Sequence, residues 1–441
     1  MRQTLENDLE AFYEANGKAH TRHLATLLRK INVAALKAAA SAARHHVPCR
    51  IPALEDSTDA SAQVERAAEK CGGQNCNLDV VFDDGVAWMA RIRLCHTLLP
   101  PDAVQRYFCL SEVATLQFLA RTKVPAPKVY AYEVDPRNPV GVAYILMEKL
   151  PGMALDWKGA NESQRAHVMS QLVDTQLELE KHPLPRAGSL ILSEATVESR
   201  EEIRVGPYAQ LPCFVTPEQP SLGPFKTLAA AYSAMINQQM RMLANGEKSD
   251  LRVDNYLAFT WRLAALPGLV RGSASREGPF YLRHYDDKGD HILVDDDYNI
   301  TGIIDWEWAS AEAKEMAFSS PCMLWSVADF FDGHNALSPD ETAFADMFAQ
   351  RGRADMADMV RGGRRWQRFL GFTGGGLPRD VEEFEALFRA LRESCAEEDG
   401  GASDVAHGLS YAEWRVKALE GVADDAQLAA LIEAENERPV M

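Results

Sequence analysis

The sequence predicts an α+β fold with two lobes, a small one built on an antiparallel sheet and a larger, mainly helical one. Segments with strand character come early in the chain, over residues 78–93 and 142–147, and the pattern beyond them is mainly helical. One further hairpin, over residues 280–305, lies among the helical segments. Strands grouped first and helices grouped later are typical of an α+β protein.

The first expected lobe covers residues 67–150 and follows a helical extension over residues 1–66. Within the extension we expect helix over residues 4–44, where leucines recur at helical spacing. Residues 48–62 contain prolines and a polar run, and they are therefore expected to form a loop.

A β-hairpin is the clearest element of this first lobe. Its strands are expected over residues 78–82 and 86–93, joined by Asp83-Asp84-Gly85. An Asp-Gly pair supports the positive φ angles of a tight turn. A helix is expected next, over residues 111–120.

The larger lobe is expected over residues 151–395 and includes the second hairpin. Residues 396–441 then form a linker and a closing helix. The linker is Gly- and acid-rich over residues 396–404, and helical spacing returns over residues 411–435.

Composition excludes some classes of partner. The chain has 441 residues, of which 46% are hydrophobic, so it can bury the core of a globular protein. The net charge of −18 would repel nucleic acid, whose binding needs clustered Lys and Arg. The charge either serves solubility or favours a site for cationic substrates or metal–nucleotide complexes.

The cysteines and the apolar runs indicate a cytoplasmic protein. The 8 cysteines are scattered; Cys71 and Cys76, the closest pair, flank residues 72–75 without a second ligand pair for zinc. Reduced thiols are therefore expected. No stretch approaches the ~20 apolar residues of a membrane span. The polar N-terminus does not resemble a targeting peptide, and no membrane association is expected.

The second hairpin concentrates the chemistry. Apolar runs at residues 292–294 and 300–304 flank a turn, which we place with its centre at Tyr298. In that register His291 faces Asp305, and Asp305 lies near the loop that contains Asp286. Converging carboxylates repel one another unless a cation lies between them, and a divalent metal with a nucleotide phosphate would satisfy them. The alternative is an ordinary acidic surface loop, which we accept for the turn itself.

Residues 284–306 resemble the H-x-D-x-x-x-x-N catalytic loop and the I-D-W element of the aminoglycoside phosphotransferase and choline kinase-like superfamily. The resemblance is strongest to its large fungal group, and matching motifs extend over roughly residues 70–310 in the same order. It implies a protein-kinase-like two-lobed fold that uses ATP and Mg²⁺. It also implies that Asp286 takes the proton of the acceptor hydroxyl and that Asp305 chelates the metal.

One residue departs from the family pattern. His291 occupies the position of the motif's Asn. The amide oxygen of an Asn suits Mg²⁺, whereas a neutral imidazole suits zinc, manganese or iron better. We therefore take His291 as a candidate metal ligand, with Asp290 as the alternative oxygen ligand. The departure leaves both the metal and catalysis itself open.

The resemblance also extends to the first lobe. Gly72 and Gly73 precede the first hairpin, where small residues let backbone amides approach phosphates, and Asn77 matches the motif's Asn. An ordinary turn is the alternative for the glycines alone. Residues 148–150, which are Glu148, Lys149 and Leu150, match the hinge whose backbone would bind the adenine edge.

An arginine and a glutamate complete the expected nucleotide site. Arg91 and Arg93 share one face of the returning strand, and the resemblance favours Arg91 as the ligand of the α and β phosphates. A solvated strand arginine is the alternative. Glu112 is expected to pair with this arginine, or else to serve at the N-terminus of its helix.

The residues after Asp305 have two readings. Trp306, Glu307 and Trp308 either border the pocket for the acceptor, where they would suit a cationic amine, or belong to the core, which we favour slightly. The predicted function is transfer of the γ-phosphoryl group of ATP to a hydroxyl of a small molecule. The alternative is a non-catalytic kinase-fold protein that binds a nucleotide or a partner.

Overall fold

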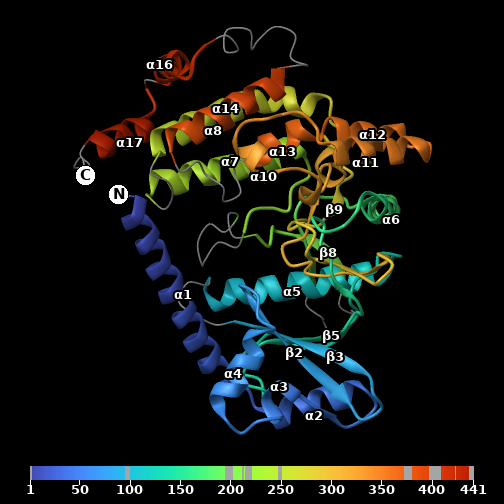
Figure 1. The fold of residues 1–441 in the computed structure, drawn as a ribbon. Coiled ribbons are helices and arrows are strands. Elements are labelled where there is room, and N and C mark those ends of the chain that lie inside the picture. Colours follow the sequence, from blue (N-terminus) through green and yellow to red (C-terminus); the bar gives the residue numbers. More distant parts are fainter. Residues whose placement is uncertain are drawn as a thin grey trace. The chain divides into compact units, whose positions relative to one another are not determined.

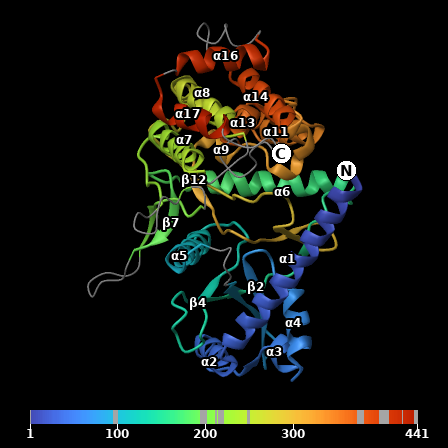
Figure 2. The same cartoon turned by 90° about the vertical axis from the view of Figure 1, so that its left-hand side faces the viewer.

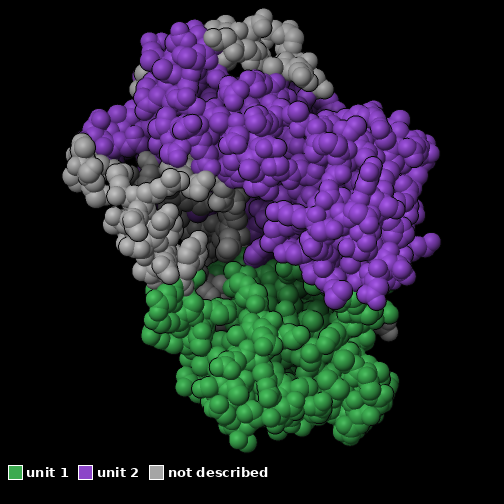
Figure 3. Space-filling view, viewed as in Figure 1, with its two compact units in different colours: residues 1–121, 125–152, 301–307 green, residues 122–124, 153–300, 308–441 purple. Residues whose placement is uncertain are grey.

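The computed structural model describes residues 2–94, 100–193, 202–210, 213, 221–246, 251–371, 380–396, 409–422 and 424–436. The chain divides into two compact units, coloured separately in Figure 3. Unit 1 comprises Met1–Arg121, Pro125–Gly152 and Thr301–Glu307, and unit 2 comprises Thr122–Val124, Met153–Ile300 and Trp308–Met441.

Unit 1 is built on a five-stranded antiparallel sheet in the order β1-β2-β3-β5-β4. Its strands are β1 (Cys49–Arg50), β2 (Asn75–Phe82), β3 (Ala87–Arg93), β4 (Val129–Glu133) and β5 (Tyr144–Glu148). The predicted hairpin is confirmed as β2 and β3, with Gly85 at a φ of +84° in the turn. Only glycine adopts this backbone conformation without strain, which explains the Asp-Gly signal.

The helices of unit 1 cover both faces of this sheet. They are α1 (Arg2–Lys30), α2 (Val33–Ala43), α3 (Pro52–Glu55), α4 (Ala60–Ala68) and α5 (Asp102–Leu119). Helix α5 lies on one side of the sheet and α2, α3 and α4 lie on the other (Figure 1; Figure 2). Apolar residues of α2 to α4 form one core with the inward side chains of β2 and β3.

One local expectation for unit 1 was wrong, and another covered only part of a helix. Residues 48–62, expected as a loop, contain β1, α3 and the start of α4. Pro52 begins α3 rather than breaking it, because proline is tolerated in the first turn of a helix. The predicted helix over residues 111–120 is the second half of α5, which begins at Asp102.

Unit 2 is mainly helical. Its helices are α6 (Glu162–Glu180), α7 (Leu228–Ala244), α8 (Arg252–Arg271), α9 (Lys314–Ala317), α10 (Val327–Phe331), α11 (Pro339–Gln350), α12 (Ala354–Arg361), α13 (Gly363–Gly371), α14 (Val381–Ala396), α16 (Tyr411–Gly421) and α17 (Ala426–Asn436). Helix α8 packs against α7, α14, α16 and α17 (Figure 2). The predicted closing helix is therefore confirmed but divided in two. Most of the expected linker, 396–404, lies outside the described residues.

Short strand pairs interrupt these helices. They are β6 (Met153–Ala154) with β10 (Ile292–Val294), β7 (Ser189–Leu192) with β8 (Ile203–Gly206), and β9 (Tyr281–Arg283) with β12 (Ser310–Glu312), all antiparallel. The pair β7–β8 was missed in the sequence. Strand β11 (Ile300–Ile303) follows β10 after the expected turn. The α+β class, with an N-terminal antiparallel sheet and a mainly helical remainder, is confirmed.

The turn between β10 and β11 corrects the predicted register. The amide of Asp295 donates to the carbonyl of Asn299, 3.1 Å away, and Asp295 Oδ1 accepts from the amide of Asn299 at 2.8 Å. The turn is therefore centred on Asp297 and not on Tyr298. Counting outwards from Asp297 does not bring His291 opposite Asp305, so that part of the prediction was wrong.

Among the helices that the structure describes, none combines the length and apolar character that a membrane span requires.

Candidate active site

In unit 1, an arginine on the central strand β3 forms an ion pair with a glutamate of α5. Arg91 Nε lies 3.0 Å from Glu112 Oε1; the Glu112 side chain is buried, and that of Arg91 is 10% exposed. Glu112 lies well inside α5, which begins at Asp102, so the alternative role at the helix N-terminus is excluded. The pairing of a strand arginine with a helix glutamate, expected from the sequence, is present in the structure.

Two more carboxylates contact the same arginine. Arg91 Nη2 lies 2.6 Å from Asp305 Oδ1 and 3.1 Å from Glu307 Oε2. Asp305 has a φ of +62°, a left-handed conformation that aspartate adopts more readily than most residues. Trp306, between the two acids, is buried and donates its Nε1 hydrogen to the carbonyl of Ile303 at 2.8 Å. This anchor holds the segment that brings both acids to Arg91.

Glu307 belongs to a second ion pair that the sequence interpretation missed. It is buried and pairs with Arg93, and it accepts a hydrogen bond of 2.8 Å from Asn75 Nδ2. Gln74 Oε1 also accepts from Arg93, at 3.2 Å. Within unit 1, Glu307 is therefore an ion-pair residue of the interior. The sequence did contain a signal for this pair: Arg91 and Arg93 are two residues apart, and so are Asp305 and Glu307.

The acids of this cluster differ in exposure. Three carboxylates face two guanidinium groups, so one negative charge is in excess. Burial raises the pKa of Glu112 to about 7; Arg91 opposes this shift, and Glu307 and Asp305 reinforce it. Burial alone would lower the pKa of Arg91, but the surrounding carboxylates raise it instead. The Asp305 side chain is 47% exposed, against 5% for Glu112.

Asp305 is thus the carboxylate available to a metal ion. Among the described residues no group of three His, Cys, Asp or Glu side chains could hold a metal ion. Mg²⁺ commonly binds one or two carboxylates and takes its other ligands from phosphates and water. One exposed carboxylate such as Asp305 is compatible with Mg²⁺ bound together with a nucleotide, and its role as a metal ligand remains a prediction.

The two glycines of the loop before β2 have free space around them. A Cβ added to Gly72 or Gly73 would meet nothing within 4 Å. Asn77 pairs with Arg91 across β2 and β3, and its Oδ1 is buried without a hydrogen-bond partner among the described residues. Their roles toward phosphates remain predictions.

The expected hinge follows β5. The amide of Lys128 donates to Glu148 Oε2 at 3.3 Å, and Lys149 Nζ lies 2.8 Å from Asp79 Oδ1. Leu150 packs against Gly302, where an added Cβ would lie 2.6 Å from Leu150 Cδ1. These side chains stabilise unit 1, and adenine binding by their backbone remains a prediction.

In unit 2, the predicted base lies on the loop between β9 and β10. Asp286 is partly exposed and forms an ion pair of 3.0 Å with Lys288. Lys288 Nζ also lies 3.7 Å from Asp290 Oδ2. The neighbouring Asp287 fixes the loop, because its Oδ1 accepts from the amide of Cys322 at 3.0 Å. Burial raises the pKa of Asp287.

His291 is buried and stacks on His284, with ring centroids 4.2 Å apart. The amide of Gly289 donates to His291 Nδ1 at 3.3 Å. Burial, reinforced by His284 and Lys288, lowers the pKa of His291 to about 2, so the ring is neutral. A neutral imidazole that accepts at Nδ1 carries its proton on Nε2, which leaves no lone pair for a metal ion. The ligand role stays a prediction, and this hydrogen bond weighs against it.

A cavity of about 720 Å³ opens beside Asp286 within unit 2. Its charged lining includes Arg283 and Glu312, which lie on the paired strands β9 and β12. Burial raises the pKa of Glu312 to about 7, opposed by a hydrogen bond from Ser310 and by Arg283. The apolar lining is largely aromatic and comprises Tyr285, Trp325, Phe330 and Phe331, together with Met235, Met316 and Leu370.

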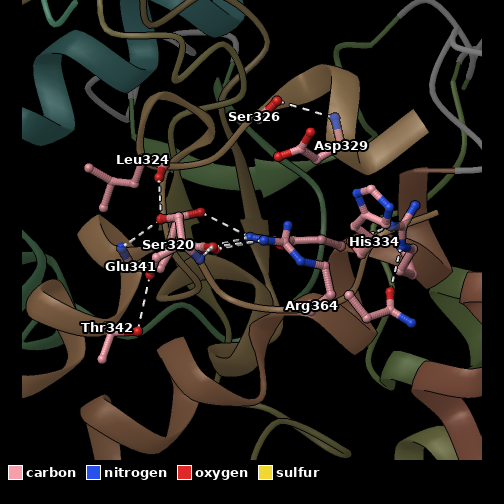
Figure 4. A network of polar contacts seen from close by, with 12 residues as sticks. Ser320, Leu324, Ser326, Asp329, His334, Glu341, Thr342 and Arg364 are labelled. Carbon is pink, nitrogen blue, oxygen red and sulfur yellow. Dashed lines mark hydrogen bonds and ion pairs between the residues drawn. The ribbon is translucent and has the colours of Figure 1, made fainter. Parts of the chain in front are cut away.

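A buried polar network supports the aromatic wall (Figure 4). Arg364 Nη2 lies 2.8 Å from Glu341 Oε2, and Ser320 Oγ donates to Glu341 Oε1 at 2.6 Å. The Arg364 guanidinium lies 4.9 Å from the centroid of the Trp325 ring. Arg368 lies 3.9 Å from the centroid of the Phe330 ring. Cation–π contacts of this kind hold rings in place.

The chain was compared with known proteins. Over 87 residues it is 38% identical to a "subtelomeric hrmA-associated cluster protein" of Aspergillus fumigatus, a match that covers 19% of this chain and 17% of that protein. The chain therefore matches less than a fifth of that relative's length.

Solved structures were also found. Plasmodium vivax ethanolamine kinase is 12% identical, with a TM-score of 0.38, over 74% of this chain and 81% of its own. A macrolide 2'-phosphotransferase from Brachybacterium faecium is 15% identical, with a TM-score of 0.36, over 82% of this chain and 97% of its own. The aminoglycoside phosphotransferase APH(4)-Ia, in a complex with ADP and hygromycin B, is 12% identical, with a TM-score of 0.38, over 83% of this chain and 91% of its own.

Residues 94–311 match the model of the phosphotransferase enzyme family. The matched range begins just after Arg91 and Arg93, and it contains Glu112, Asp286 and Asp305. Residues 94–311, just under half of the chain, are therefore similar to the phosphotransferase enzyme family, as the motifs predicted.

Proposed function

We propose that this protein transfers the γ-phosphoryl group of ATP to a hydroxyl group of a small molecule. The observation that carries the proposal is the contact of Arg91 with both Glu112 and Asp305. In this proposal Arg91 binds the α and β phosphates, and Glu112 holds its guanidinium in place. Asp305 holds Mg²⁺, which when bound would neutralise charge on the phosphates.

Asp286 is proposed to orient the acceptor hydroxyl and to take its proton. It lines the cavity of unit 2 and forms an ion pair with Lys288. The proposal also requires that Asp286 and Asp305 face the same γ-phosphoryl group during its transfer.

The cavity lining indicates the character of the acceptor. Its acids are nearly balanced by its bases: Asp286 pairs with Lys288, and Arg283 lies 3.7 Å from Asp287. A lining of this kind does not suit a polycation. We therefore propose an acceptor with an apolar body that packs on the aromatic wall, and with polar groups that meet Arg283 and Glu312. The acceptor would carry at most one positive charge, which Glu312 would balance.

A non-catalytic nucleotide-binding protein is the second candidate. The hydrogen bond from Gly289 to His291 supports it, because it leaves the position of the motif's Asn without a metal ligand at His291. In that case ATP would bind at Arg91 without being turned over.

Thermal unfolding with Mg-ATP tests the nucleotide site. A ligand at about 100 Kd stabilises a protein by roughly 2.7 kcal/mol, so Tm should rise in the wild type. Arg91→Ala should abolish the rise. Arg137→Ala, at an exposed arginine of unit 1 that pairs only with Asp135 among the described residues, should keep it. No rise at millimolar ATP with Mg²⁺ or Mn²⁺ would refute nucleotide binding.

Release of ADP across a panel of apolar alcohols, amino alcohols and sugars tests the chemistry. Asp286→Asn should lower turnover about 100-fold or more while leaving the ATP-induced rise in Tm intact. Asp297→Asn, in the surface turn, is the control. Wild-type turnover in Asp286→Asn would mean that the base is misassigned. ATP binding without turnover of any acceptor would favour the non-catalytic candidate.

A further inference from the structure

Two cysteines lie at the two ends of the glycine loop of residues 72–75. They are directly opposite each other in an antiparallel bridge. Cys71 pairs with Cys76. The flanking hydrogen bonds run from the Gly72 amide to the Asn75 carbonyl, 2.9 Å, and from the Asn77 amide to the Lys70 carbonyl, 3.0 Å. Because these bonds flank the cysteines rather than join them, Cys71 and Cys76 form a non-hydrogen-bonded pair.

This kind of pair has the geometry that a disulfide needs. Its Cα atoms are about 4.5 Å apart, and its side chains lie on the same side of the ladder. Disulfides span Cα distances of about 4.4–6.8 Å. A bond between them therefore requires little movement of the backbone.

The two thiols differ in environment. Cys71 is partly exposed, whereas Cys76 is buried and its thiol lies 3.8 Å from the carbonyl of Ala67. The neighbouring Cys76 lowers the pKa of the Cys71 thiol, although burial opposes the shift. Cys71 is thus the thiol that meets an oxidant first, and Cys76 is the resolving thiol.

We propose that Cys71 and Cys76 are a reversible redox site that forms an internal disulfide with small disulfides such as oxidised glutathione. The thiolate of Cys71 attacks the glutathione disulfide and releases one glutathione thiolate. The Cys76 thiol then loses its proton and attacks the mixed disulfide at the Cys71 sulfur, which releases the second glutathione. Two protein thiols are oxidised and one glutathione disulfide is reduced.

The disulfide would close the loop of residues 72–75 into a covalent ring. This loop contacts the buried cluster of unit 1, because Gln74 accepts from Arg93 and Asn75 donates to Glu307. Oxidation should therefore reduce the mobility of the loop and stabilise unit 1 against unfolding.

Peptide mass spectrometry tests the site on the full-length protein. Trypsin releases residues 71–91 as one peptide that contains both cysteines. After treatment with oxidised glutathione and blocking of free thiols, this peptide should be unblocked and about 2 Da lighter than its dithiol form. Cys71→Ser should give only the blocked or glutathione-bearing peptide, and Cys49→Ser, at a buried cysteine of the same unit, should behave as the wild type.

Thermal unfolding supplies a second readout. Oxidation should raise Tm by a few degrees in the wild type and not in Cys71→Ser, and reduction should reverse the rise. In urea the internal disulfide should form more slowly, because the bridge geometry is lost. A peptide that stays fully blocked, or that carries glutathione without an internal bond, would overturn the proposal. The ATP-induced rise in Tm of the reduced protein tests the nucleotide site separately.

Discussion

Replacing Glu307 by glutamine tests whether the second ion pair stabilises unit 1. The substitution keeps the shape of the side chain and removes its charge. The Arg93 side chain, only 3% exposed, would lose this ion pair and keep its contacts with Gln74, Asn75 and the ring of Phe108, whose centroid lies 5.6 Å away. Removing one partner of a buried ion pair typically costs about 3–5 kcal/mol.

The expected loss lies at the lower end of that range. The glutamine amide can still accept a hydrogen bond from Arg93. Glu307 also raises the pKa of Glu112, so its removal relieves repulsion between two buried acids. We therefore expect Glu307→Gln to lower the free energy of opening of the β2–β3 hairpin by roughly 3 kcal/mol.

Native-state hydrogen exchange measures this quantity for unit 1 alone. The amides of β2 and β3 should exchange faster in Glu307→Gln, and those of α8 in unit 2 should not change. A double-mutant cycle with Arg93→Met should show that the two substitutions together cost less than the sum of their separate costs. If exchange in β2 and β3 stays within about 0.5 kcal/mol of the wild type, or if the two costs simply add, the structural role is refuted. If Glu307→Gln changed only the KM for the acceptor, the result would instead support the alternative that residues 306–308 border the acceptor pocket.

Three further predictions concern unit 2. Burial raises the pKa of Glu312 from 4.5 to about 7, so the folded protein binds more protons than the unfolded chain between these values. Glu312 should therefore make the protein less stable as pH rises through that window, by at most about 3 kcal/mol, and the loss measured by urea unfolding should be smaller in Glu312→Gln; Glu112, whose pKa is also raised, still contributes in both proteins. Arg364→Met leaves Glu341 buried without its cation and should cost about 3–5 kcal/mol in the same assay, whereas Arg361→Met, at a half-exposed pair, should cost less than about 1. His291→Asn should leave the preference between Mg²⁺ and Mn²⁺ in ATP-induced thermal shifts unchanged, and a move towards Mg²⁺ would restore the ligand role.

Local signals in the sequence predicted the longer elements well. The β2–β3 hairpin follows from alternation and from an Asp-Gly turn, both of which act over a few residues. Strand β1 carries no such signal, because it has two residues and exists through pairing of Cys49 with Phe82 and of Arg50 with Val81. Pairing over long distances along the chain stabilises such short strands, and local composition does not reveal it.

The register error has a similar cause. Composition identified residues 295–299 as a turn, but its centre depends on which backbone groups the Asp295 side chain accepts from. Asp295 Oδ1 accepts from the amides of Asp297 and Asn299, a pattern that favours a turn centred on Asp297. A shift of one residue at the centre changes the partner of every residue in the strands.

The family motifs identified Arg91, Glu112 and Asp305, but not how many acids one arginine would contact. Glu307 lies 216 residues from Arg91, and neither helical nor strand periodicity connects them. Its position two residues after Asp305 becomes informative only once Arg93 is placed two residues after Arg91. The role of Glu307 thus follows from the tertiary arrangement of unit 1.

That arrangement also explains why an arginine suits this strand position. Arg91 presents Nε to Glu112, while its Nη2 meets both Asp305 and Glu307. A planar guanidinium offers donors in fixed and different directions, whereas a lysine ammonium is a single charged point at the end of a flexible chain. With a lysine, the contact to Glu112 and the contact to Asp305 would compete for one nitrogen. With the arginine, Glu112 and Glu307 hold the guanidinium on one side, and in the function that we propose the exposed Asp305 would exchange its contact for a metal ion and phosphates.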